Sequence, residues 1–171
     1  QKALDKVVSY MDVARSEGVD IVAGGNRVET DNGFFFEPTL FDGVKAGMRV
    51  EQEEIFGPVL SVIEVSSFEE AIEVNNNTRY GLSSSIFTEN VNVAFKAIRD
   101  ISTGIVYINH GTTGAEIQFP FGGTRGTGNG MREAGQAALT SFTEWKSVYV
   151  DYSGRLQRAQ IDTEAVLGEQ E

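Results

Sequence analysis

The residues with the clearest capacity for chemistry lie in one short segment, VEQEEIFGPVL, at positions 50–60. A polar run that ends at Glu54 meets an apolar run that is interrupted by Gly57 and Pro58. Carboxylates set directly against an apolar run with a Gly-Pro break raise the question of whether Glu54 has a role in binding. Taken alone, these residues favour a simpler interpretation, in which Glu54 is a solvated charge at a helix end and Phe56 belongs to the core.

Cysteine and histidine, which often carry catalysis or bind metals, are nearly absent. The chain has no cysteine, which excludes a disulfide framework, a thiolate nucleophile and a cysteine metal site. His110 is the only histidine, so a multi-histidine metal site is excluded and we expect no metal. Because histidine titrates near neutral pH, His110 is a candidate base, with an ordinary loop residue as the alternative.

The charge balance restricts the partners of the chain. It has 25 acidic and 14 basic residues and a net charge of −11, which argues against a nucleic-acid or anionic-membrane surface. No apolar run approaches the length that crosses a bilayer. We therefore expect neither nucleic acid nor membrane as a partner.

Helix and strand signals alternate along the chain, which predicts an α/β domain with a largely parallel sheet. Ser67 has the spacing of a helix cap, with Glu70 three residues later. The apolar run at 55–65 predicts one or two buried strands. The other expected helices are 4–17, 90–101 and 132–142, and the other expected strands are 20–25, which ends in a glycine turn, 33–41, 83–88, 104–110 and 145–152.

A glycine-dense stretch, FPFGGTRGTGNGMREAG, invites comparison with a dinucleotide-binding loop. That motif needs G-x-G-x-x-G directly after an apolar strand, whereas Gly126, Gly128 and Gly130 recur at every second position. We favour a loop that lets backbone segments pass close to one another.

Four segments in order, EEIFGPVL, NNNTRYGLSSSIFT, GIVYINH and PFGGTRGTGNGMREAG, resemble the C-terminal part of an NAD(P)-dependent aldehyde dehydrogenase. The resemblance runs from about Leu4 to about Tyr152. It implies that residues 1–143 are the C-terminal part of the catalytic domain and that 144–153 are an oligomerisation strand. Residues 154–171 are then a tail, which we expect to be partly disordered because it is acidic and aperiodic.

The resemblance gives roles to two residues of the first segment. It implies that Glu54 hydrogen-bonds the hydroxyl groups of the nicotinamide ribose and that Phe56 packs near the same ribose and the nicotinamide. The implied cofactor is NAD or NADP. The implied location of the enzyme is cytoplasmic.

The resemblance also accounts for the missing cysteine. In this family a cysteine thiolate attacks the aldehyde, hydride passes to the cofactor, and a glutamate base assists hydrolysis of the thioester. Those residues precede the matched region, so we expect no catalytic residue in this chain and no activity from it alone. Since that chemistry does not require His110, a loop role is favoured for it. The absence of an initiator Met at Gln1 also leads us to expect a piece of a longer chain.

Residues 110–121 resemble the loop that lines the aldehyde tunnel of the family. The implied substrate-binding residues are Gly114, Ala115 and Phe121, with backbone amides near Gly114 placed to bind a distal carboxylate. The loop looks like that of the branch that oxidises polar semialdehydes, such as aminoadipate or ketoglutarate semialdehyde. A plain connecting loop is the alternative.

Residues 144–152, EWKSVYVDY, resemble the strand that pairs with a neighbouring subunit, which implies a homo-oligomer, either a dimer or a tetramer. An unpaired strand of this kind also predicts self-association of the isolated chain. Two other functions stay open. One is a standalone pseudo-enzyme module that binds a small acid or a partner subunit, and the other is a nucleotide-binding domain in its own right.

Overall fold

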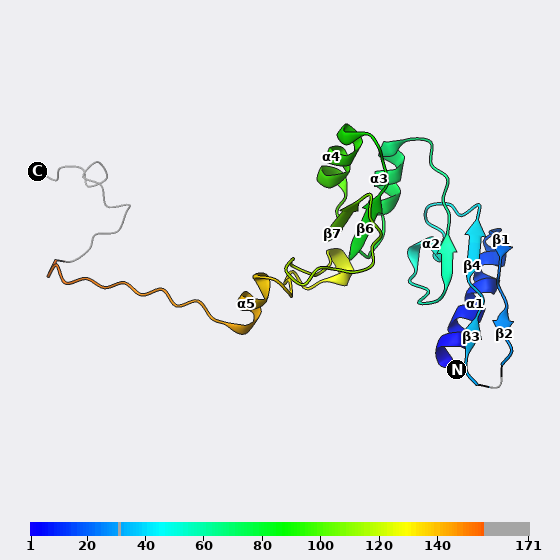
Figure 1. Ribbon diagram of the computed structural model, residues 1–171, viewed down its shortest axis with the longest axis horizontal. Helices are drawn as coiled ribbons and strands as arrows, with labels where there is room; N and C mark the ends of the chain where they lie inside the picture. Colours follow the sequence, from blue (N-terminus) through cyan, green and yellow to red (C-terminus); the bar gives the residue numbers. More distant parts are fainter. Residues whose placement is uncertain (31, 156–171) are drawn as a thin grey trace, which may run out of the picture. The chain divides into compact units, whose positions relative to one another are not determined.

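The computed structural model describes residues 1–30 and 32–155 (Figure 1). The chain divides into one unit of residues 1–141 and a second unit that begins at Phe142. None of the helices in the described residues is long and apolar enough to cross a membrane.

The first unit opens with helix α1 (Lys2–Ser16), as predicted. Its buried face follows the helical repeat, with Val7, Tyr10, Met11 and Ala14 all turned inward. The helix ends before Gly18, which has a φ of 75°, a conformation that glycine adopts without steric cost. This face covers one side of the core.

The other side of that core comes from a three-stranded sheet in the order β1-β4-β5 and from the short helix α2 (Arg49–Gln52). The strands are β1 (Asp20–Ala23), β4 (Thr39–Asp42) and β5 (Val59–Ser61). A hairpin of β2 (Arg27–Val28) and β3 (Phe35–Phe36) lies between β1 and β4 in sequence. Phe41 of β4 is fully buried and packs with α1, Val50 and Ile55.

A second α/β element follows in the same unit. It consists of α3 (Phe68–Asn76), β6 (Ser83–Ile86), α4 (Val91–Asp100) and β7 (Ile105–Ile108). The predicted cap is confirmed, because the backbone N–H of Glu70 donates to Ser67 Oγ at 3.1 Å. The α/β class predicted from the sequence is therefore confirmed.

The prediction of a largely parallel sheet holds for only part of the chain. Strands β4 and β5 pair in parallel, and so do β6 and β7, with a helix in each connection. Strands β1 and β4 are antiparallel, as are β2 and β3. The reason is that no helix crosses between β1 and β4, and a chain that turns back through a hairpin pairs antiparallel.

Two local predictions were wrong in extent. The run at 55–65 forms only the short strand β5, and Leu60 is 62% exposed because it points to the face of the strand opposite to Val59 and Ser61. The helix expected at 132–142 is only α5 (Ala137–Phe142). Ala134 and Gly135 have φ values of 64° and 53°, which no right-handed helix allows.

The glycine-dense stretch forms a backbone crossing, as predicted, and contains the 3₁₀ turn η1 (Arg125–Thr127). The N–H of Gly126 donates to the carbonyl of Arg79 at 2.9 Å. A Cβ atom at Gly128 would come within 2.3 Å of the carbonyl oxygen of Gly123. Only glycine permits so close an approach of two backbone segments.

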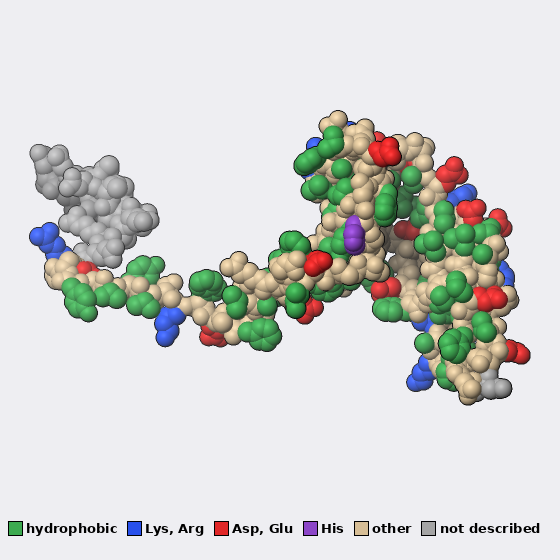
Figure 2. All heavy atoms as spheres, in the orientation of Figure 1, with side chains coloured by type: hydrophobic (Ala, Val, Ile, Leu, Met, Phe, Trp, Pro, Cys, Tyr) green, Lys and Arg blue, Asp and Glu red, His purple; other side chains and the backbone are tan. Residues whose placement is uncertain are grey.

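The second unit carries large side chains with little cover. Trp145, Tyr149 and Tyr152 are each at least 90% exposed, and Figure 2 shows hydrophobic side chains standing out along this stretch. No strand is assigned within 143–152, since no other segment of the described chain pairs with it. Pairing with a neighbouring subunit stays a prediction. The expected tail lies outside the described residues from position 156 onward.

Candidate functional site

The turn after α2 gives the segment around Glu54 its shape. Ile55 is buried in the core and anchors the turn from inside. The next residue, Phe56, has a φ of 54°, a left-handed conformation that turns its ring away from the core. The Phe56 side chain is 77% exposed, which rules out its interpretation as a core residue in this chain.

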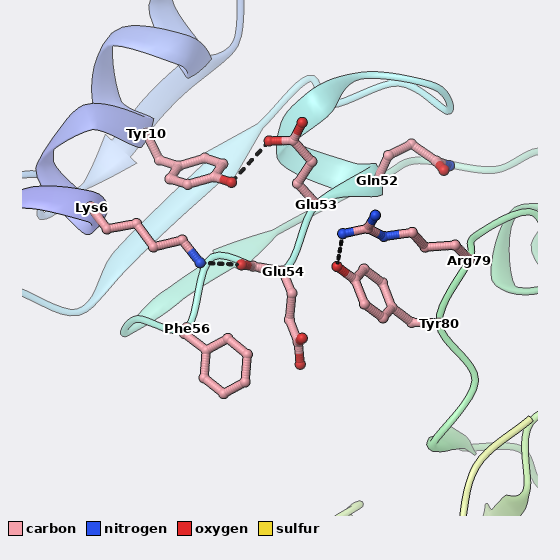
Figure 3. A pocket seen from close by; sticks show the side chains of 8 residues that line it. All are labelled: Lys6, Tyr10, Gln52, Glu53, Glu54, Phe56, Arg79 and Tyr80. Carbon is pink, nitrogen blue, oxygen red and sulfur yellow. Dashed lines mark hydrogen bonds between the residues drawn. The ribbon is translucent and has the colours of Figure 1, made fainter. Parts of the chain in front are cut away.

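Glu54 and Phe56 line one pocket of about 580 Å³ (Figure 3). This volume falls within the range of small-molecule sites. In Figure 3 the two side chains point the same way from the turn. The lining comes from α1, from the end of α2 with its turn, and from the loop before β6; it comprises Lys6, Tyr10, Gln52, Glu53, Glu54, Phe56, Arg79 and Tyr80.

The two adjacent carboxylates of this pocket have different partners. Glu53 accepts a hydrogen bond from Tyr10 Oη at 2.9 Å and two from the Arg49 guanidinium at 3.1 and 3.0 Å. Among the described residues, no group hydrogen-bonds the Glu54 carboxylate, which points into the pocket. Glu54 is therefore the carboxylate available to a ligand.

Lys6 supports the turn from α1. Its ammonium donates to the carbonyl oxygen of Glu54 at 2.8 Å and lies 5.5 Å from the centre of the Phe56 ring. A cation over an aromatic face is attracted to it, so Lys6 restrains both the backbone and the ring.

The hydrogen bonds of Glu53 with Arg49 and Tyr10 shift the pKa values of Glu53 and Tyr10. Hydrogen bonds from Arg49 and then Tyr10 hold the pKa of Glu53 below its ordinary value. Burial and the hydrogen bond to Glu53 raise the pKa of Tyr10. Both shifts favour an ionised Glu53 and a neutral Tyr10, which is the arrangement that the hydrogen bond requires.

The pocket has the chemistry of a site for a hydroxylated ligand with a flat ring. A free carboxylate can accept from two neighbouring hydroxyl groups at once. An exposed aromatic ring beside it offers a face or an edge for packing. These residues fit the ribose and nicotinamide of a dinucleotide, which is the group implied for them.

The predicted substrate residues are brought together only in part. Ala115 and Phe121 line a second, mainly apolar pocket of about 330 Å³ beside β7, whereas Gly114 is exposed and does not line it. Phe121 is held by an isolated bridge to Glu133, with hydrogen bonds of 2.6 and 2.9 Å. Carboxylate binding by backbone amides near Gly114 stays a prediction.

His110 lies in the loop after β7 and stacks on Tyr107, with the ring centres 5.6 Å apart. Sequence reasoning did not identify Lys6, Tyr10 or Arg79 as pocket residues. Lys6 and Tyr10 are four positions apart on α1, so their side chains lie on the same side of the helix. That spacing does not reveal which other segment of the chain they contact.

The fold and the pocket together define an α/β segment suited to a hydroxylated, ring-bearing ligand. Residues 1–148 match the model of the aldehyde dehydrogenase family, and the chain belongs to that family.

Named relatives agree with this assignment. The chain is 42% identical to an alpha-ketoglutaric semialdehyde dehydrogenase of Bacillus subtilis over 150 residues, which cover 86% of this chain and 31% of the relative. It is also 42% identical to an alpha-ketoglutarate semialdehyde dehydrogenase of Haloferax volcanii over 156 residues, covering 89% of this chain and 32% of the relative.

Among solved structures, an indole-3-acetaldehyde dehydrogenase in complex with NAD+ superimposes with a TM-score of 0.83 at 39% identity. The match covers 88% of this chain and 30% of that one. The chain thus spans about a third of the length of the relatives it matches.

Proposed function

We propose that the protein to which this segment belongs oxidises an aldehyde to a carboxylic acid with NAD+ or NADP+. In this proposal the segment supplies contacts to the nicotinamide ribose, part of the substrate site and a subunit contact. The proposal rests on one observation: the side chains of Glu54 and Phe56 line the same pocket, in a chain that belongs to the aldehyde dehydrogenase family.

Each of the two residues has a distinct task. The Glu54 carboxylate accepts hydrogen bonds from the two ribose hydroxyl groups and thereby fixes the orientation of the ring attached to that sugar. The Phe56 ring packs against the same end of the cofactor and limits its tilt. When bound, the cofactor accepts the hydride from the substrate.

The substrate class that we propose is a polar semialdehyde. Two relatives at 42% identity are named as alpha-ketoglutarate semialdehyde dehydrogenases, which supports this class. In the proposal Ala115 and Phe121 contact the substrate body, and backbone amides near Gly114 bind a distal carboxylate. The catalytic cysteine and the glutamate base lie outside this segment.

We also propose a homo-oligomer, dimer or tetramer, that forms through residues 144–153. The exposed aromatic side chains of Trp145, Tyr149 and Tyr152 support this, since a strand with such side chains is stabilised by a partner.

The test uses the full-length gene product isolated from its own cells. Its intact mass is measured first, and NADH or NADPH formation is then followed with ketoglutarate semialdehyde and with an apolar aldehyde of similar length. We expect a mass well above 18.6 kDa and a higher kcat/KM for the semialdehyde. A mass of 18.6 kDa with no activity would instead favour a standalone binding module.

Glu54→Gln in the same protein tests the cofactor contact. We expect a loss in kcat/KM for the cofactor of roughly tenfold, the value of one hydrogen bond to a charged group. Glu69→Gln makes the same chemical change on exposed α3, outside the pocket, and should leave the kinetics unchanged. Equal kinetics for Glu54→Gln and wild type would remove Glu54 from the site.

A further inference from the structure

Helix α1 holds the segment 53–57 at three successive points. Tyr10 donates to the Glu53 carboxylate at 2.9 Å, and Lys6 donates to the Glu54 carbonyl at 2.8 Å. Gly57 lies against Val7, where an added Cβ atom would come within 2.5 Å of Val7 Cγ2. The turn is therefore fixed by contacts from outside itself.

We propose that Tyr10 and Glu53 are a positioning pair, which fixes the direction of the Glu54 side chain toward the cofactor. The inference rests on the proposed function, because it assigns to Tyr10 and Glu53 an effect on the site of Glu54. Both residues line the pocket, and in this proposal they act on the cofactor through the orientation of Glu54.

The need for such a pair follows from the sequence of the turn. Glu53 and Glu54 are adjacent, chemically identical and both line the pocket, so the bare sequence leaves either carboxylate free to face a ligand. Three hydrogen bonds on Glu53 commit it to Tyr10 and Arg49. Successive side chains of an extended segment point to opposite sides, so fixing Glu53 directs Glu54 to the other side. Figure 3 shows this divergence.

Tyr10 and Arg49 hold the Glu53 carboxylate in different ways. Arg49 makes a two-point contact with Glu53 from within the same exposed turn, so it fixes the carboxylate only relative to α2 itself. Tyr10 is 8% exposed and reaches Glu53 from 43 positions away, so its hydroxyl ties the end of α2 to the core-facing side of α1. A hydrogen bond from a nearly buried donor to a carboxylate is strong.

The experiment compares Tyr10→Phe and Glu53→Gln with wild type in the full-length protein. Measured quantities are kcat and KM for the cofactor and for the aldehyde, the effect of deuterium at the aldehyde carbon on the rate, and the melting temperature. Tyr10→Phe keeps the buried ring and removes only the hydroxyl. Ser67→Ala is the matched control, because it removes the α3 cap and lowers stability without touching the pocket.

We expect both pocket variants to raise KM for the cofactor about fivefold to tenfold, with KM for the aldehyde unchanged. The isotope effect should rise, since a poorly oriented cofactor slows hydride transfer. Ser67→Ala should lower the melting temperature and leave the kinetic constants and the isotope effect at wild-type values.

Two results would overturn the inference. In the first, Tyr10→Phe and Glu53→Gln both keep the wild-type KM for the cofactor, while Glu54→Gln is impaired. The proposed function would then stand, but Tyr10 and Glu53 would not be a positioning pair. The other is an identical change in Ser67→Ala, which would mean that any loss of stability moves the constants. If Glu54→Gln also matches wild type, the proposed cofactor contact itself fails.

Discussion

The ammonium group of Lys6 lies 5.5 Å from the centre of the Phe56 ring, on the exposed side of the turn that follows α2. The same ammonium donates to the carbonyl oxygen of Glu54 at 2.8 Å. One side chain of α1 thus restrains an aromatic ring and the backbone beside it, although the ring has no place in the core.

Lys6→Met should therefore loosen the turn. The substitution keeps an apolar stem of similar length and removes the charge with its hydrogen bond and its contact to the ring. We expect the free energy of unfolding to fall by about 1 kcal/mol, measured by urea denaturation. Lys2→Met, on the same helix and away from the pocket, is the control. Equal losses for both variants would show that Lys6 has no special contact.

Phe56→Ala and Phe41→Ala should differ sharply in stability. Phe41 is fully buried, so its loss should cost about 3–5 kcal/mol through the cavity that remains. Phe56 is 77% exposed, so its loss should change the free energy of unfolding by less than about 1 kcal/mol. Urea denaturation measures both. A large loss for Phe56→Ala would mean that its ring is buried in solution.

Gly57→Ala should destabilise the protein because Val7 stands in the way. The new methyl group would lie 2.5 Å from Val7 Cγ2, and a β-branched side chain on a helix has little freedom to move. We expect a loss of about 1–3 kcal/mol. Gly111→Ala, where the nearest atom is 3.9 Å away, should be tolerated. The melting temperatures of the two variants give the comparison, and equal values would contradict the close contact.

The contribution of Glu53 to stability should depend on pH. Arg49 and then Tyr10 lower the pKa of Glu53 from its ordinary 4.5, so the folded state binds its proton less readily than the unfolded state does. The stabilisation is then fully present above pH 4.5 and is lost as the pH falls through the lower folded pKa.

Urea denaturation of wild type and Glu53→Gln between about pH 7 and about pH 2 measures this dependence. The difference in free energy of unfolding should be largest near neutral pH and should shrink in acid. Other acidic groups with lowered pKa values, such as Glu70 and Asp100, are present in both proteins and cancel in the comparison. A difference that is constant with pH would contradict the lowered pKa.

Residues 142–155 should drive self-association of the isolated chain. Trp145 and Tyr149 are about nine-tenths exposed, and large apolar side chains in a row favour contact with another molecule. Light scattering should show species larger than a monomer, and the double variant Trp145→Asp, Tyr149→Asp should reduce them. A monodisperse monomer of the unmodified chain at high concentration would contradict this prediction.

Much of the fold could be predicted from local patterns. The periodicity of α1, the Ser67 cap of α3 and the β-rich run of β7 each depend on residues within one element. The run at 55–65 could not be judged in the same way, because burial of Leu60 depends on whether another layer covers the face of the sheet to which it points. The shortened α5 had a similar cause, since the pairing of Glu133 with Phe121 takes residues that the pattern gave to a helix.

The pocket could be predicted only in part for a related reason. Glu54 and Phe56 were identified through resemblance, and their residue types alone favoured a different interpretation. Tyr10 was not singled out from the sequence, where it is one residue of a predicted helix. Its hydroxyl acquires a role through a contact 43 positions away, which no local pattern encodes.

The sequence separation of two contacting residues also affects the order in which contacts form during folding. In the part of the chain that the structure describes, strand pairing joins residues at most 22 positions apart, as for Asp20 with Asp42 and Ser83 with Ile105. The contact of Tyr10 with Glu53 closes a longer loop, which costs more entropy, so we expect the sheets to form first. A contact that forms after the transition state slows unfolding without speeding folding. The contact of Tyr10 with Glu53 would then slow unfolding, while pairing within the sheets would set the folding rate.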